Sequence, residues 1–117
     1  MAKVNDVAAY ILDSFSGPIS TMKLQKLVYY SQAWHLAWDE APMFEDEIEA
    51  WAAGPVVRSL YAQHRGGFII SELRSGKPKA LAQTERETID SVIETYGNMS
   101  GQQLSDLTHS ELSLIHI

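Results

Sequence analysis

Residues 23–38, KLQKLVYYSQAWHLAW, are the most strongly patterned stretch of the chain. Core-type residues recur here at intervals of three or four, the spacing that places side chains on one face of an α-helix. This face, which we predict to be buried, consists of Leu24, Leu27, Val28, Ser31, Trp34 and Trp38. Lys23, Lys26 and Tyr30 occupy another side of the same helix, at positions i, i+3 and i+7. The stretch therefore predicts a long helix that has a core face and a second, more polar face.

Four further helices are predicted from signals elsewhere in the sequence. They begin near Asn5, Gly54–Pro55, Thr84 and Ser100. The first of them ends at Gly17–Pro18, a pair that does not continue a helix. Proline is favoured at the first helical position, so Pro55 is expected to open the helix that follows it. Residues 84–87 and 100–103 have the spacing of capping boxes, in which two side chains satisfy backbone N–H groups at a helix start.

Two short segments have the features of β-strands. Residues 46–52 alternate between two kinds of side chain. One side carries Ile48, Ala50 and Ala52, and the other carries Glu47, Glu49 and Trp51. Residues 68–73, FIISEL, are rich in residues that favour strands and predict a second one. The sequence therefore predicts a mainly α fold, a single compact domain of about five helices with a small β element.

The composition is that of an ordinary globular domain. The chain has 117 residues, which fits one domain, and 45% of them are hydrophobic. It contains no cysteine, which excludes disulfides, thiolate zinc sites and a cysteine nucleophile. Neither the N-terminal residues nor any other segment resembles a signal peptide or a membrane span, so we expect a cytoplasmic protein with no membrane partner. A net charge of −6 argues against a nucleic-acid partner, because phosphates require clustered basic residues.

The sequence shows no catalytic or metal-binding motif. The four histidines are not spaced as metal ligands on one helix, so no metal site is predicted. No GxSxG, GxGxxG or phosphate-binding glycine loop occurs. Glu45, Asp46, Glu47 and Glu49 are interpreted as a solvated strand face rather than as a catalytic pair. We therefore expect a protein that is not an enzyme and needs no cofactor.

A second stretch, WAAGPVVRSLY at residues 51–61, contains side chains that a turn does not require. Glycine and proline explain the bend, but they do not account for Trp51, Arg58 and Tyr61. Tryptophan, tyrosine and arginine are the residues that most often anchor protein interfaces. The predicted partner-binding residues are therefore Lys23, Lys26, Tyr30, Trp51, Arg58 and Tyr61. The alternative is that Tyr30, Trp51 and Tyr61 are packed in the core.

The order and spacing of the two stretches resemble the Panacea domain, the SocA-like antitoxin and phage-associated family. The matching residues are Lys23-Leu24-Gln25-Lys26-Leu27 with Tyr29-Tyr30, Gln32 and Trp34, then Glu49-Ala50-Trp51, Gly54-Pro55-Val56 and Leu60-Tyr61. Two composite motifs in register are more specific than either motif alone. The resemblance begins near residue 4 and ends near residue 111, so the domain is predicted to be residues 1–111.

The resemblance implies a function that the composition does not. It implies an antitoxin of a bacterial or phage toxin–antitoxin pair, which neutralises a cognate protein toxin by direct binding. The alternative that it implies is an adaptor that delivers a toxin or another client to a Clp-type protease. Family members usually continue beyond Glu111 with a tryptophan-containing segment, whereas LSLIHI follows here. We therefore expect residues 112–117 to be a non-native or truncated tail.

Overall fold

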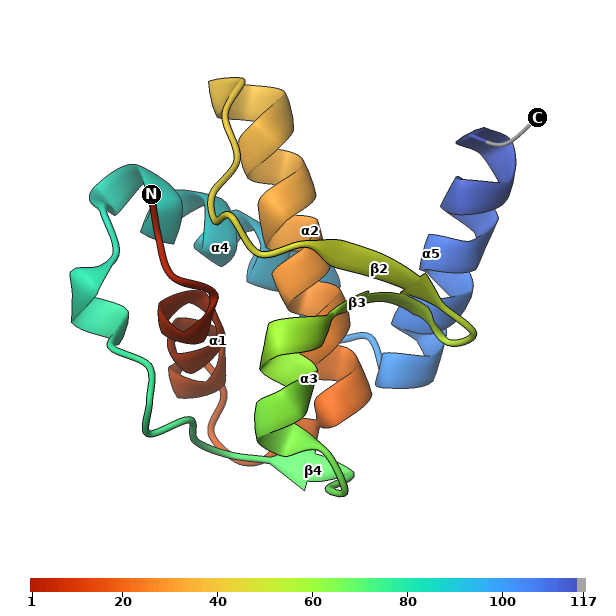
Figure 1. Ribbon diagram of the computed structural model, residues 1–117, viewed down its shortest axis with the longest axis horizontal. Helices are drawn as coiled ribbons and strands as arrows, with labels where there is room; N and C mark the ends of the chain where they lie inside the picture. Colours follow the sequence, from red (N-terminus) through yellow and green to blue (C-terminus); the bar gives the residue numbers. More distant parts are fainter. Residues whose placement is uncertain (116–117) are drawn as a thin grey trace.

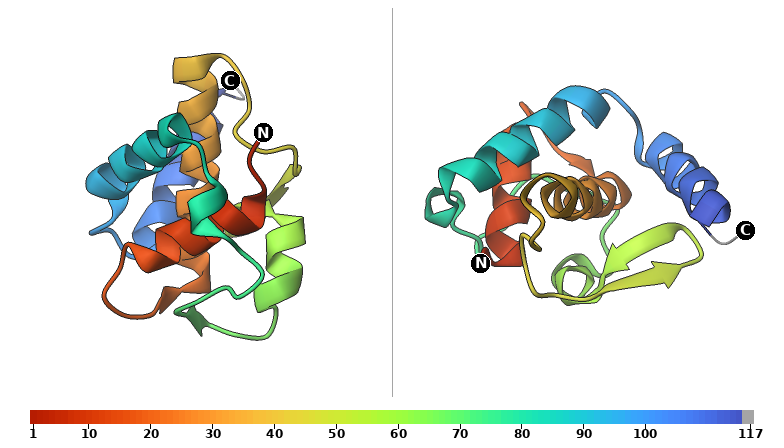
Figure 2. Two further views of the ribbon diagram at one scale, coloured as in Figure 1. Left: turned by 90° about the vertical axis from the view of Figure 1, so that its left-hand side faces the viewer. Right: turned by 90° about the horizontal axis from the view of Figure 1, so that it is seen from above.

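The helix α2, Thr21–Asp39, is the longest of the structure and stands at its centre (Figures 1 and 2). This computed structural model describes the backbone of residues 1–115 and the side chains of residues 1–111. The other helices are α1 (Val4–Asp13), α3 (Arg58–His64), α4 (Gln83–Tyr96) and α5 (Gly101–Ile115), with a short 3₁₀ helix, η1, at Pro78–Ala80. All four other α-helices contact α2. The predicted mainly α fold of five helices with a small β element is confirmed.

The core is built on the face of α2 that the apolar spacing predicts. Leu24, Leu27 and Val28 are fully buried against aliphatic side chains of the neighbouring helices. Trp34, however, is only half-buried, and Trp38 is 58% exposed. The prediction that Trp38 belongs to the core is therefore wrong. Its helical spacing is correct, but the last turns of α2 project beyond the elements that cover the rest of the helix (Figures 1 and 2).

A β-hairpin stands where the sequence predicts the start of a helix. β2, Ile48–Trp51, pairs antiparallel with β3, Gly54–Val57, across a two-residue turn. Gly54 has a φ of +109°, a conformation that side chains other than glycine rarely adopt. Since α3 begins only at Arg58, the prediction that Gly54–Pro55 opens a helix is wrong. The fixed φ of proline suits an edge strand as well as a first helical turn, so the local sequence does not separate the two.

The second predicted strand is shorter than expected and has a partner that the sequence does not mark. β4, Ile69–Ile70, pairs antiparallel with β1, Ile19–Ser20. Ser20 also caps α2, because its hydroxyl accepts the N–H of Lys23 at 3.0 Å. The pairing thus holds the start of the central helix beside the segment that follows α3.

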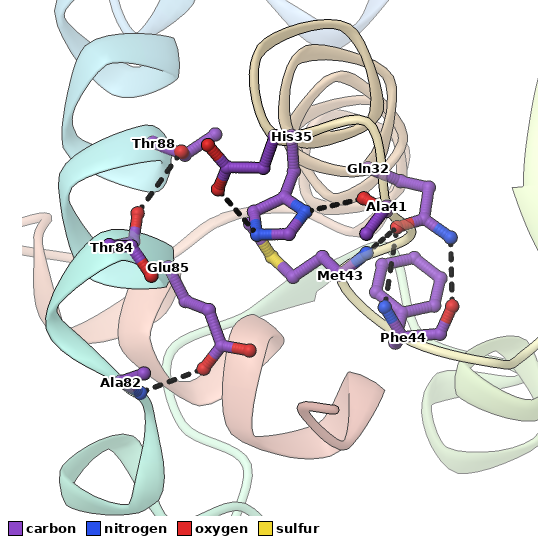
Figure 3. Close-up of polar contacts among 10 residues, drawn as sticks. Gln32, His35, Ala41, Met43, Phe44, Ala82, Thr84, Glu85 and Thr88 are labelled. Carbon is purple, nitrogen blue, oxygen red and sulfur yellow. Dashed lines mark hydrogen bonds and ion pairs between the residues drawn. The ribbon is translucent and has the colours of Figure 1, made fainter.

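Side-chain caps fix the starts of the last two helices. At α5, the Ser100 N–H donates to Gln103 Oε1 at 2.8 Å and the Gln103 N–H donates to Ser100 Oγ at 3.1 Å. Both bonds of the predicted capping box are therefore present. The capping box predicted at residues 84–87 is wrong, because α4 begins at Gln83 and Thr84 lies inside the helix. The start of α4 is instead capped by the carboxylate of Glu85, which accepts the N–H of Ala82 at 2.7 Å (Figure 3).

The last helix extends past the predicted end of the domain, since the described backbone of α5 continues to Ile115. The prediction that residues 112–117 are a tail lies outside the residues whose side chains the structure describes, and it stays a prediction. Within residues 1–115, no helix is long and apolar enough to cross a bilayer.

Candidate partner-binding site

The outer edge of β3 faces α2 rather than another strand. With a two-residue turn, the β2–β3 register directs the backbone polar groups of Pro55 and Val57 away from β2. Gln25 satisfies those of Val57, because its Oε1 accepts the N–H at 2.9 Å and its Nε2 donates to the carbonyl at 3.2 Å. Lys26 Nζ donates to the carbonyl of Pro55 at 3.2 Å. Two neighbouring side chains of α2 therefore take the place of a third strand and fix the hairpin against the helix.

Lys26 is an internal residue of this arrangement. It is 1% exposed, and burial lowers its pKa to about 8. Gly54 lies directly against it, since a Cβ at this position would come within 2.7 Å of Thr108 Oγ1 and 3.0 Å of Lys26 Cε. This close approach requires a glycine at the turn of the hairpin.

Tyr30 and Lys23 also have partners inside the chain. Tyr30 is 3% exposed, its hydroxyl donates to Glu111 Oε1 at 2.6 Å, and its ring stacks on Tyr96 with 4.2 Å between the ring centroids. Burial, followed by the bond to Glu111, raises the pKa of Tyr30. Lys23 is half-buried, and its Nζ donates to the carbonyl of Gly97 at 2.6 Å. These contacts connect α2 to the end of α4 and to α5.

Trp51, Arg58 and Tyr61 lie together on the outside of the hairpin and of α3. The rings of Trp51 and Tyr61 meet edge to face, with 4.8 Å between their centroids. Glu49 connects Trp51 to Arg58. Its Oε1 accepts the Trp51 indole N–H at 2.9 Å, and its Oε2 lies 3.6 Å from Arg58 Nη1. The Arg58 side chain is 74% exposed, and the two aromatic rings are half-buried. We refer to Glu49, Trp51, Arg58 and Tyr61 as the hairpin face.

His64 connects the hairpin face to the interior. Its ring lies 5.4 Å from that of Tyr61, and its Nε2 lies 2.9 Å from Gln25 Nε2. Because the amide nitrogen of Gln25 donates, His64 Nε2 accepts, and the ring is neutral in this arrangement. Burial lowers the pKa of His64, which favours the same neutral form. Gln25 thus supports the Tyr61 ring of the hairpin face through His64.

The surface beside the hairpin face is shallow and acidic. A hollow of about 420 Å³ adjoins it, lined by Asp46, Glu47, Glu49, Arg58, Ser59 and Ala62. Within the described residues, no group of three histidine or carboxylate side chains is placed to hold a metal ion. The hairpin face offers instead two aromatic rings and a guanidinium, which are the groups that most often anchor protein interfaces, together with the carboxylate of Glu49.

Comparison with known proteins identifies the family of the chain. The family described as Antitoxin SocA-like, Panacea domain, matches residues 24–112, from α2 to α5. The chain belongs to this family. Antitoxin SocA of Caulobacter vibrioides (strain NA1000 / CB15N) is 30% identical to it over 119 aligned positions. The alignment covers 89% of this chain and 63% of the relative, so the chain spans less than two thirds of that protein's length. No solved structure matches the chain.

In this Panacea domain the six predicted partner-binding residues fall into two groups. Trp51, Arg58 and Tyr61 come together in the hairpin face. Lys23, Lys26 and Tyr30 instead form hydrogen bonds within the domain, and the last two are buried. The two sequence motifs that identify the Panacea domain are therefore joined in space, because the first motif holds the second through Gln25 and Lys26.

Sequence reasoning missed three residues that organise the hairpin face. Glu49 was interpreted as part of a solvated acidic face, although its position two residues before Trp51 places both side chains on one side of the strand. Gln25 and His64 gave no such signal. The hydrogen-bond partners of Gln25 are Val57 and His64, which lie 32 and 39 positions further along the chain. Only the fold brings these partners together.

Proposed function

We propose that this chain is an antitoxin that binds a cognate protein toxin directly and thereby neutralises it. The observation that carries the proposal is the family match, which includes the whole hairpin face. The relative from Caulobacter vibrioides is itself named an antitoxin. The proposal places both proteins in the cytoplasm. It assigns the chain no catalytic step and no cofactor, because direct binding requires neither.

We assign the toxin contact to the hairpin face. A stable protein interface buries about 800 Å² on each partner and depends on a few anchor residues. Trp51, Tyr61 and Arg58 are of the types that most often provide these anchors. Gln25 and Lys26 hold the hairpin in place, so the face is ordered before the toxin arrives and little conformational freedom is lost on binding.

Lys23, Lys26 and Tyr30 enter this proposal as residues that position the site. Lys26 bonds to the backbone of the hairpin, so changing it would move the hairpin face rather than remove a contact. Lys23 and Tyr30 hold α4 and α5 against α2, farther from the face. A substitution at Lys26 should therefore affect toxin binding through the position of the hairpin, whereas substitutions at Lys23 and Tyr30 should chiefly affect stability.

Co-expression with the protein encoded by the adjacent gene tests the proposal. The chain should restore the growth that this protein inhibits and should be captured with it in a pull-down. Arg58→Glu should weaken the capture by about tenfold or more, because arginine is a frequent anchor and the new charge is repelled where arginine was attracted. Arg74→Glu is the matched control, because the Arg74 side chain is 90% exposed and also faces a carboxylate. Its Nε lies 3.3 Å from Glu72 Oε1, and Arg58 Nη1 lies 3.6 Å from Glu49 Oε2.

The possible outcomes separate the site from the function. Circular dichroism establishes that each variant is folded. If Arg58→Glu and Trp51→Ala are folded and neutralise as the parent does, the hairpin face is not the site. If the parent chain neither restores growth nor captures the adjacent protein, the antitoxin function is wrong.

The amount of toxin in the same cultures distinguishes two modes of neutralisation. Direct binding leaves the toxin level unchanged while growth recovers. A toxin level that falls when this chain is present, and recovers when Clp-type proteases are deleted, would identify the chain as a proteolytic adaptor instead.

A further inference from the structure

The last turns of α2 expose apolar side chains around much of their circumference. Successive residues of an α-helix are about 100° apart around the axis. At this spacing, the five apolar side chains of residues 33–38 fall within an arc of roughly 200°. In order around the helix they are Leu36, Ala33, Ala37, Trp34 and Trp38, which we refer to as the apolar arc. Leu36 is 51% exposed, Trp38 is 58% exposed and Ala37 is also exposed. Ala33 and Trp34 are half-buried, and the Trp34 ring lies 5.5 Å from that of Tyr96 at the edge of the arc. A helix that is apolar over so wide an arc is normally buried on that side.

The opposite side of the same turns is firmly held (Figure 3). His35 Nδ1 donates to the carbonyl of Ala41 at 2.7 Å, and His35 Nε2 lies 3.0 Å from a carboxylate oxygen of Asp39. One turn earlier, the amide of Gln32 accepts an N–H at 2.6 Å and donates to a carbonyl at 2.9 Å, both in the backbone of residues 43–44. The apolar arc is therefore presented by an ordered helix, and little further ordering is needed when a partner binds.

The charge next to the apolar arc restricts what covers it. From Leu27 to Val57 the chain contains neither lysine nor arginine. The carboxylates nearest to the arc in the chain are those of Asp39 and Glu40, whereas Asp46, Glu47 and Glu49 line the hollow beside the hairpin face. Asp39 and Glu40 follow the arc directly and are exposed; Asp39 is paired with His35, and Glu40 has no such ion pair among the contacts described above. A second copy of this chain would bring like charges together, which disfavours self-association through the arc and favours a basic partner.

We propose that the apolar arc is a second contact surface, which binds a segment of the toxin that carries apolar side chains beside lysine or arginine. The inference rests on the proposed function for the identity of this partner. The arc lies at the projecting end of α2, whereas the hairpin face lies beside α3 (Figure 1), so one toxin would contact two separate surfaces. Burial of the apolar side chains supplies the affinity. The carboxylates select a basic partner, and the exposed ring of Trp38 adds to this selection because a cation is attracted to its face.

Nuclear magnetic resonance of the ¹⁵N-labelled full chain tests this inference without any toxin. The chain has three tryptophans, Trp34, Trp38 and Trp51, so its indole N–H signals report on both surfaces. The probe is a synthetic helix-forming peptide of leucine and lysine, and the same peptide with glutamate in place of lysine is its control. We expect the leucine–lysine peptide to shift the Trp38 signal saturably and to leave the Trp51 signal unchanged. The leucine–glutamate peptide should shift neither signal.

Two variants complete the experiment. Leu36→Ser keeps Trp38 as the reporter and should weaken peptide binding by about tenfold, because it removes an apolar side chain that the peptide buries. Ile69→Thr is the matched control, since Ile69 is 69% exposed on β4 and lies outside both surfaces, and it should bind as the parent does.

Three results would overturn the inference. They are an absence of saturable shifts, a leucine–lysine peptide that shifts only the Trp51 signal, and a Leu36→Ser variant that binds the peptide as tightly as the parent. Because the experiment contains no toxin, each of these results is distinct from a failure of the co-expression experiment.

Discussion

Lys26 should make the domain more stable as the solution becomes alkaline. It is 1% exposed, and its Nζ donates to the carbonyl of Pro55 at 3.2 Å. Burial lowers its pKa from the ordinary 10.5 to about 8. At about 1.4 kcal/mol for each pKa unit, keeping the charged form in the folded domain costs about 3 kcal/mol at neutral pH.

The sign of the pH dependence follows from proton uptake. Between about pH 8 and pH 10.5 the unfolded chain holds more protons on Lys26 than the folded domain does, so the free energy of unfolding rises with pH. The cost of the buried charge is fully present below about pH 8. From about pH 7 to about pH 9.5 the free energy of unfolding should rise by about 2 kcal/mol. Burial raises the pKa of Tyr30, so its ionisation lowers the stability again above about pH 10.

Urea unfolding of the parent and of Lys26→Met between about pH 7 and pH 9.5 measures this contribution. Methionine keeps the length of the side chain and removes its charge, so the rise with pH should disappear. At neutral pH the variant should be at least as stable as the parent, because the carbonyl of Pro55 loses a donor at a cost of only about 1–3 kcal/mol. Lys77→Met, at an exposed lysine, is the control that should keep the rise. If Lys26→Met shows the same rise as the parent, Lys26 is not the buried cation that we describe.

Three further substitutions test the clamp and the aromatic contacts by urea unfolding at neutral pH. Gln25→Leu should cost about 2–4 kcal/mol, because it leaves the N–H and the carbonyl of Val57 without the partners that Gln25 provides. Gly54→Ala should cost about 2–4 kcal/mol, because a Cβ at φ +109° is strained and meets Thr108 Oγ1 at 2.7 Å. Trp34→Ala should cost about 2 kcal/mol, less than a core tryptophan, because its ring is half-buried. A cost below about 0.5 kcal/mol for any of them, the range of ordinary surface changes, would contradict the contacts described for that residue.

Local signals in the sequence were sufficient to predict that five helices exist, although not where α3 and α4 begin. The spacing of Leu24, Leu27 and Val28 predicts the buried face of α2, because helical periodicity depends only on residues within a few turns. The capping box of Ser100 and Gln103 was predicted for the same reason, since its two bonds join residues three positions apart. These features follow from neighbouring residues alone.

The remaining features depend on contacts between distant residues. Pro55 is compatible with a helix start and with an edge strand, and the donation from Lys26, 29 positions away, favours the strand in the folded domain. Trp38 has the helical spacing of a core residue, but burial requires a second element over it, and no spacing reports whether one is there. The sequence likewise does not report which of the six predicted partner-binding residues other elements cover. The structure buries Lys26 and Tyr30 and so separates them from the hairpin face.

Hydrogen–deuterium exchange of the toxin complex tests most directly whether the hairpin face contacts the toxin. The exchange of backbone amides is measured in the free chain and in the chain bound to the protein encoded by the adjacent gene. We predict slower exchange on binding for residues 48–64, which form β2, β3 and α3, and unchanged exchange for residues 72–80 around η1. A complex that forms while the exchange of residues 48–64 stays unchanged would contradict the assignment of the hairpin face as the site where the toxin binds.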